Sequence, residues 1–133
     1  MWWGATIIPS LAISTDAAAW LGVFLAIAGA TVCLAGVYRF RLARTTVDPR
    51  QPGRTSAFVT GGIYGWSRNP MYLGFLLLLL GWGAYIASPV AILIAITFVP
   101  YMNRFQIVPE ERMLLSMFGD TFVAYANRVR RWI

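Results

Sequence analysis

Residues 71–102 read MYLGFLLLLLGWGAYIASPVAILIAITFVPYM, an apolar run without a charged residue. The run is too long for one crossing of a bilayer, which takes about 20 residues of helix. It is interrupted at Ala87-Ser88-Pro89, where Ser-Pro is a turn signal and a proline can open the next helix. The run therefore predicts a helical hairpin with arms near residues 71–86 and 90–104. Both arms are short for a spanning helix, which implies little tilt or a locally thinned bilayer.

A second apolar run, AAAWLGVFLAIAGATVCLAGVY at residues 17–38, lies before the hairpin. Its length suits one crossing, and arginines follow it at once, as is typical of a cytoplasmic helix end. Residues 1–13 are apolar, short and interrupted by Pro9, and we expect another membrane-embedded segment there. The sequence thus predicts a single all-α domain over residues 1–133, a polytopic membrane protein with three to four membrane helices.

The pattern changes after the hairpin. Apolar residues recur there at three- and four-residue spacing between charged ones, at Leu114, Met117, Phe118, Phe122 and Tyr125. This periodicity predicts a C-terminal amphipathic helix over residues 109–129, which lies along the membrane interface or packs back on the preceding loop. Pro109 and the two glutamates after it suit the positive end of a helix, and Gly119 is expected to kink it.

The composition excludes several classes of function. Of the 133 residues, 59% are hydrophobic and 12% are charged, whereas soluble domains usually carry about 25% charged residues. The chain has no histidine, which argues against an imidazole-ligated metal and against a Ser-His or Cys-His pair. The net charge of +6 comes from arginines that flank apolar helices, which fits a membrane protein better than a nucleic-acid-binding one. We predict no metal site and no nucleic-acid partner.

The eleven arginines determine the expected topology. A hairpin returns the chain to the side that it left, so the arginines before and after it share one face of the membrane. By the positive-inside rule that face is cytoplasmic, and Asp16 is the one charge on the other side. We expect an integral protein of a bacterial inner membrane whose functional face is cytoplasmic. Its loop over residues 45–69 is long for a mere connection, and long ordered loops are often functional.

Two polar clusters flank the hairpin. GIYGWSRNPMYLG at residues 62–74 leads into it, and RFQIVPEE at residues 104–111 leads out of it. Because a hairpin places its two ends side by side, these clusters should meet on the arginine-rich face. Together they supply guanidinium groups, amides, phenols and two carboxylates to one place.

These motifs resemble the isoprenylcysteine carboxyl methyltransferase family and the related phospholipid methyltransferases. The resemblance is carried by Gly-x-Tyr-x3-Arg-Asn-Pro-x-Tyr-x-Gly at residues 62–74 and by the Glu-Glu pair at residues 110–111, and it covers about residues 40–132. It implies S-adenosylmethionine in a pocket that faces the cytoplasm, and a lipidic acceptor that enters from the bilayer. The cofactor contacts that it implies fall on Phe58, Val59, Tyr64, Asn69, Pro70, Met71, Tyr72 and Glu110.

The chain departs from the family pattern at two positions. Asn69 stands where many members have histidine, so an imidazole is not available for proton transfer. Gln106 stands where the eukaryotic branch has an arginine that contacts substrate, and Arg104 lies nearby. We expect Arg104 and Gln106 to orient the acceptor.

The chemistry of S-adenosylmethionine suits the residues of the two clusters. Glu110 could accept hydrogen bonds from its ammonium or ribose hydroxyls, and Arg68 or Arg104 could pair with its carboxylate. Tyr64 and Tyr72 offer aromatic faces for the adenine or the sulfonium.

The residues leave the methyl acceptor open between a carboxylate and an amine. A carboxylate needs no general base, whereas an amine must lose a proton, and Glu110 or Glu111 would be the candidate base. The acceptor site itself is expected to be hydrophobic, and the oligomeric state is not indicated.

Each of these features also has a simpler explanation. The glutamate pair could be a helix start favoured by the macrodipole, the tyrosines could be interfacial aromatics, and the arginines could be topology anchors or contacts with anionic headgroups. Gly74, Gly81 and Gly83 are expected to be helix-packing positions. The alternative function is a small non-catalytic membrane scaffold or assembly protein. A transporter is disfavoured, because residues 17–38 and 71–86 hold no charge.

Overall fold

The computed structural model describes residues 15–45 and 60–133, and every regular element in these ranges is helical, which confirms the all-α prediction. Helix α1 spans Thr15–Thr45, the 3-10 turn η3 spans Gly62–Gly65, and α2 spans Pro70–Tyr85. They are followed by α3 (Pro89–Met102), the π-helical turn η4 (Asn103–Ile107), α4 (Val108–Phe118) and α5 (Asp120–Arg128). The expected N-terminal segment 1–13 and most of the expected loop 45–69 lie outside the described residues.

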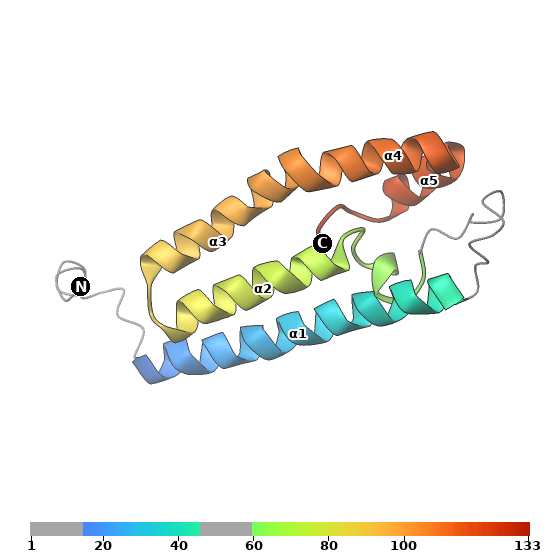
Figure 1. Cartoon of the computed structure of the whole chain (residues 1–133). Coiled ribbons are helices and arrows are strands. Elements are labelled where there is room, and N and C mark those ends of the chain that lie inside the picture. The colour runs from blue at the N-terminus through green and yellow to red at the C-terminus, as the bar shows by residue number, and fades with distance from the viewer. Residues whose placement is uncertain (1–14, 46–59) are drawn as a thin grey trace.

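Helices α2 and α3 form the predicted hairpin (Figure 1). The turn falls at Ala87, whose φ of 49° lies in the left-handed region. Ser88 caps α3, because its hydroxyl accepts a hydrogen bond from the backbone N–H of Ala91 at 3.3 Å. Pro89 occupies the first turn of α3, where its missing N–H costs nothing. The Ser-Pro signal thus places the turn where the sequence predicted it.

Helix α1 packs antiparallel against α2 (Figure 1). Glycines of both helices line the contact between them, which we call the α1–α2 seam. A Cβ atom on Gly22 would lie 2.6 Å from the carbonyl oxygen of Gly81, and one on Gly29 would lie 2.7 Å from that of Gly74. A Cβ atom on Gly83 would meet Ile92 of α3 at 3.0 Å. Small residues at these positions let the helix backbones approach closely, which confirms that Gly74, Gly81 and Gly83 are packing positions.

The prediction of one separate helix over residues 109–129 is wrong in two respects. First, no helix begins at Pro109, because the chain stays helical from α3 through η4 into α4. The wider π turn comes just before Pro109, a residue that lacks an N–H and whose ring would clash in a regular helix. Second, Gly119 breaks the helix rather than kinking it. Its φ of 55° ends α4, and α5 starts from there.

Two helical stretches, Thr15–Leu42 and Pro89–Phe118, are long and apolar enough to cross a membrane, and α2 is apolar but shorter. Only 17% and 11% of their most apolar windows are buried inside the molecule. Large apolar side chains point outward instead, such as Trp20, which is 74% exposed. These helices therefore differ from the core helices of a soluble protein, which bury their apolar side chains.

A small core attaches α5 to α4. Phe122, Tyr125 and Val129 are buried together, and Leu114 and Phe118 of α4 pack against them. The Tyr125 hydroxyl donates to the Tyr64 carbonyl and so joins α5 to η3. The residues after α5 run back between α2 and the helix that continues α3 (Figure 1).

Candidate active site

A cavity of about 400 Å³ lies where the two ends of the hairpin meet. Its volume falls within the range of small-molecule sites, about 300–1,000 Å³. The polar clusters that flank the hairpin thus come together, as their positions in the sequence predicted. The residues that line the cavity are Phe40, Tyr64, Arg68, Asn69, Pro70, Met71, Tyr72, Glu110, Met113, Leu114 and Tyr125.

Among the described residues that line this cavity, Glu110 is the one with a carboxylate. It accepts a hydrogen bond from the hydroxyl of Tyr72 at 2.8 Å and another from Nε2 of Gln106 at 2.6 Å. Gln106 lies one helical turn before Glu110, while Tyr72 comes from the first turn of α2. Because the helix runs on unbroken from α3, Glu110 and Glu111 do not sit at a free helix start, and the macrodipole explanation of this pair loses its basis.

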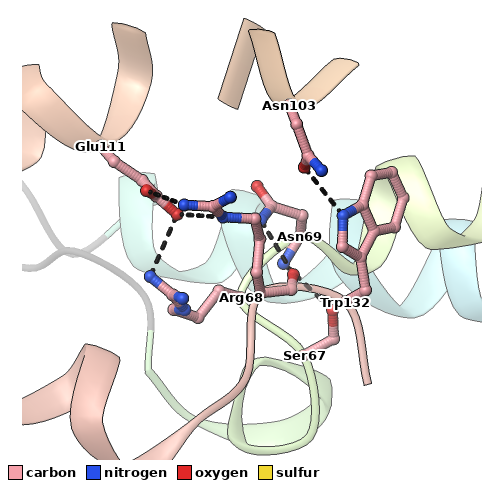
Figure 2. Close-up of polar contacts among 7 residues, drawn as sticks. Ser67, Arg68, Asn69, Asn103, Glu111 and Trp132 are labelled. Carbon is pink, nitrogen blue, oxygen red and sulfur yellow. Dashed lines mark hydrogen bonds and ion pairs between the residues drawn. The ribbon is translucent and has the colours of Figure 1, made fainter. Parts of the chain in front are cut away.

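Glu111 points to a different set of partners and does not line the cavity. One of its oxygens accepts from Nη1 of Arg68 at 3.0 Å. Arg131 donates to both of its oxygens, from Nε at 3.0 Å and from Nη2 at 2.8 Å. Figure 2 shows the Glu111 carboxylate joined to both guanidinium groups. This fork-like pairing is the geometry in which an arginine binds a carboxylate best.

The residues just before α2 are held by local and distant hydrogen bonds. The buried Ser67 hydroxyl accepts from the backbone N–H of Asn69 at 3.1 Å, and Nδ2 of Asn69 donates to the carbonyl of Arg131 at 3.0 Å (Figure 2). The backbone N–H of Arg68 donates to the carbonyl of Arg130 at 3.0 Å. The Nε atom of Arg68 is buried and has no hydrogen-bond partner within the described chain.

Two buried tyrosines close another part of the cavity. The hydroxyl of Tyr125 in α5 donates to the backbone carbonyl of Tyr64 in η3 at 2.7 Å. Burial raises the pKa of Tyr125 to about 12, although the nearby Arg68 charge opposes this rise. Burial, and then the Glu110 charge, raise the pKa of Tyr64 as well. Both phenols therefore stay protonated at neutral pH.

The predicted site residues fall into four groups. Those that line the cavity are Tyr64, Arg68, Asn69, Pro70, Met71, Tyr72 and Glu110. Gln106 and Glu111 do not line the cavity but bind residues that do, Glu110 and Arg68 respectively. Arg104 is exposed and is not among the lining residues, so the structure does not bring it to the cavity. Phe58 and Val59 lie outside the described residues.

Several residues of the cavity were not predicted as site residues. Met113 and Leu114 lie three and four positions after Glu110 and share its face of α4, a spacing that could have identified them. Phe40 of α1 and Tyr125 of α5 come from distant elements. No pattern around them in the sequence indicates that they reach the same cavity.

Comparison with known proteins gives a family match over most of the chain. Residues 17–121 match the family described as phospholipid methyltransferase. An uncharacterised protein of Haemophilus influenzae is 44% identical over 63 residues, which are 47% of this chain and all of that protein. No solved structure matches.

Other similar proteins are protein-S-isoprenylcysteine O-methyltransferases. The one from Saccharomyces cerevisiae is 32% identical over 53% of this chain and 30% of its own length. Protein-S-isoprenylcysteine O-methyltransferase B of Arabidopsis thaliana is 38% identical over 53% of this chain and 36% of its own length. The matched part thus spans about a third of these relatives.

Proposed function

Because the chain belongs to the phospholipid methyltransferase family, we propose that it transfers a methyl group from S-adenosylmethionine to a lipidic or apolar acceptor at the cytoplasmic face of a membrane. The observation that carries this proposal is the cavity that joins Arg68, Asn69 and Tyr72 from one end of the hairpin to Glu110 from the other. Two of the relatives are protein-S-isoprenylcysteine O-methyltransferases, and their names support methyl transfer.

The residues of the cavity fit the polar groups of S-adenosylmethionine. The partnerless Nε donor of Arg68 is the most telling, because a buried N–H without an acceptor is costly and a cofactor carboxylate would satisfy it. Glu110 would accept from the ammonium or from the ribose hydroxyls, with its orientation held by Tyr72 and Gln106. The aromatic faces of Tyr64 and Tyr72 suit an adenine ring or a sulfonium.

The described residues offer little general-base chemistry. When bound, the cofactor supplies an electrophilic methyl group on a sulfonium that is a good leaving group. The raised pKa values of Tyr64 and Tyr125 keep these phenols protonated, and the chain has no histidine. One oxygen of Glu110 already accepts two hydrogen bonds, and in this proposal the carboxylate binds the cofactor. An acceptor that is already anionic, such as a carboxylate, therefore suits this site better than an amine, because no residue then has to remove a proton.

The exposed rim of the cavity is apolar and indicates how the acceptor enters. Met113 of α4 is 57% exposed and Phe40 of α1 is 38% exposed, whereas Tyr64 and Tyr125 are buried. The tyrosines would thus close the inner end, and the apolar part of the acceptor would lie along Phe40 and Met113. The protein would mainly align the acceptor with the methyl group, and such alignment contributes several kcal/mol to catalysis.

The proposed location is a membrane, with the cavity on its cytoplasmic side. The outward apolar faces of α1 and α3 support lipid as their surroundings. The arginines in the last turns of α1 and those after α3 support a cytoplasmic orientation for the end that holds the cavity, as in a bacterial inner membrane.

Binding of S-adenosylhomocysteine, measured by isothermal titration calorimetry on the purified chain in detergent, tests this function. We expect wild type to bind and Glu110→Gln to bind about 10- to 100-fold more weakly, the usual loss for a hydrogen bond to a charged group. Asp120→Asn is the matched control, since it neutralises an exposed carboxylate away from the cavity. Folded wild-type protein that binds no S-adenosylhomocysteine would contradict the proposal and favour a scaffold instead.

A further inference from the structure

Residues 129–132, which we call the C-terminal strap, lie between the two ends of the hairpin (Figure 1). On the α2 side, the carbonyl of Arg130 accepts from the backbone N–H of Arg68, and the carbonyl of Arg131 accepts from the side-chain amide of Asn69, each at 3.0 Å. Arg68 and Asn69 are residues of the cavity wall. The strap therefore binds two residues of the cavity wall without lining the cavity itself.

On the other side, the strap is fastened to the helix that leaves the hairpin. Arg131 binds Glu111 of α4 through two hydrogen bonds, of 3.0 and 2.8 Å. Nε1 of Trp132 donates to the side-chain oxygen of Asn103 in η4 at 2.9 Å (Figure 2). The rings of Trp132 and of Phe98 in α3 pack edge to face. The strap thus bridges α2 to the helix formed by α3, η4 and α4.

No strap residue is among those that line the cavity. The strap can influence a ligand there only through the residues that it holds. Two of its backbone carbonyls bind Arg68 and Asn69 directly, and the guanidinium of Arg68 is connected to the strap through Glu111. Its carboxylate is shared between Arg131 and Arg68, so the arginine of the strap and the arginine of the wall are bound to one group. Loss of the Glu111 carboxylate would remove the ion-pair partner of Arg68, and loss of the Arg131 side chain would leave that carboxylate held by Arg68 alone.

We infer that Arg131 and Glu111 are positioning residues, which hold Arg68 and Asn69 in place for the cofactor through the docked C-terminal strap. This inference rests on the proposed function, because it assigns the strap a role at that same site. Glu111 then acts as an anchor for two arginines, and Arg131 acts inside the molecule rather than on lipid headgroups.

Neighbouring arginines provide a sharp control. The side chain of Arg130 is exposed, and only its backbone carbonyl contributes to the strap. If the C-terminal arginines served only to bind anionic headgroups, Arg130→Ala and Arg131→Ala would have equal effects, because each removes one positive charge. The strap predicts that only the second variant changes the site.

The test measures the affinity for S-adenosylhomocysteine and the thermal stability of each variant in the same detergent. We expect Arg130→Ala to stay within twofold of wild type, and Arg131→Ala and Glu111→Gln to bind at least tenfold more weakly. The double variant should bind no more weakly than Glu111→Gln, because Glu111→Gln already breaks the link that Arg131→Ala removes. Arg131→Lys keeps the positive charge but cannot form the paired hydrogen bonds, so its affinity should lie between those of wild type and Arg131→Ala. This variant also tests the inference if Arg131→Ala does not fold.

Hydrogen exchange at the backbone amide of Arg68 provides a second readout that does not depend on the cofactor. This amide should exchange faster in Arg131→Ala but not in Arg130→Ala, because its acceptor is the carbonyl of the strap. If Arg131→Ala bound S-adenosylhomocysteine as wild type does and its Arg68 amide exchanged at the wild-type rate, the positioning role would be overturned and the proposed function would stand. Absence of binding by folded wild type would instead overturn the proposed function, and the positioning role with it.

Discussion

At the scale of single residues, the hydroxyl of Tyr125 connects α5 to the wall of the cavity. It donates to the carbonyl of Tyr64 at 2.7 Å, and both residues are buried. Tyr125→Phe should lower the free energy of unfolding by about 1 kcal/mol, since a buried carbonyl loses its partner. Chemical denaturation in detergent would measure this change. Tyr101→Phe, at an exposed ring, is the control and should change stability little; equal losses in both variants would contradict this role of the Tyr125 hydroxyl.

The pKa of Tyr125 makes a related prediction about pH. Burial raises this pKa from 10.0 to about 12, so the unfolded chain loses the phenol proton at lower pH than the folded one. Unfolding thus becomes more favourable as pH rises from 10 to 12, and the contribution of Tyr125 is complete below pH 10. Tyr125→Phe should lose less stability over this range than wild type, as measured by denaturation at several pH values. An identical decline would show that Tyr125 does not titrate abnormally.

At the scale of elements, the α1–α2 seam sets two opposing effects against each other at Gly29. Alanine favours a helix over glycine by about 1 kcal/mol, so propensity alone predicts that Gly29→Ala stabilises the protein. A Cβ atom there would lie 2.7 Å from the Gly74 carbonyl, and overpacking of this kind costs about 1–3 kcal/mol. We expect net destabilisation, measured as a lower melting temperature. Gly65→Ala meets only one atom, at 3.9 Å, and is the control.

Helix α4 presents a matched pair of methionines for testing the rim. Met113 lines the cavity, whereas Met117, one turn further and similarly exposed, does not. Met113→Trp should lower methyl transfer from labelled S-adenosylmethionine to a lipid extract about tenfold, because the larger ring narrows the rim for the acceptor. Its affinity for S-adenosylhomocysteine should stay near that of wild type. Met117→Trp should transfer normally, and equal losses from both variants would place the acceptor elsewhere.

At the scale of the whole molecule, the proposed topology places the two ends of the hairpin on one side of the membrane and its turn on the other. With Cys33→Ala as background, a membrane-impermeant maleimide should label Arg112→Cys only from the cytoplasmic side of bacterial vesicles. It should label Ile86→Cys, next to the turn, only from the opposite side. Both positions are exposed in the molecule, so lack of access would come from the membrane. Labelling of both from one side would contradict the topology.

The sequence by itself determined the features that depend on local patterns. The Ser-Pro signal located the hairpin turn at residues 87–89, and the apolar runs located both ends of α2 to within one residue and the start of α1 to within two. Helix α1 continues to Thr45, seven residues beyond its apolar run. The meeting of the two polar clusters followed from the hairpin alone, because connected antiparallel helices must place their ends together. The exact extent of the C-terminal helices did not follow, since Pro109 signals a helix start in isolation and a π turn allows the helix to run through it.

Only the tertiary structure decided what each charged residue of the site does. Glu110 and Glu111 are identical in sequence terms, yet about 100° of helix rotation separates adjacent positions, so one faces the cavity and the other faces Arg68 and Arg131. The rotation of the helix after the π turn decides which of the two glutamates faces the cavity. Arg131 likewise resembles any other arginine of a basic tail until the chain folds back through α5. Both outcomes arise from contacts between residues far apart in the chain, which no local pattern records.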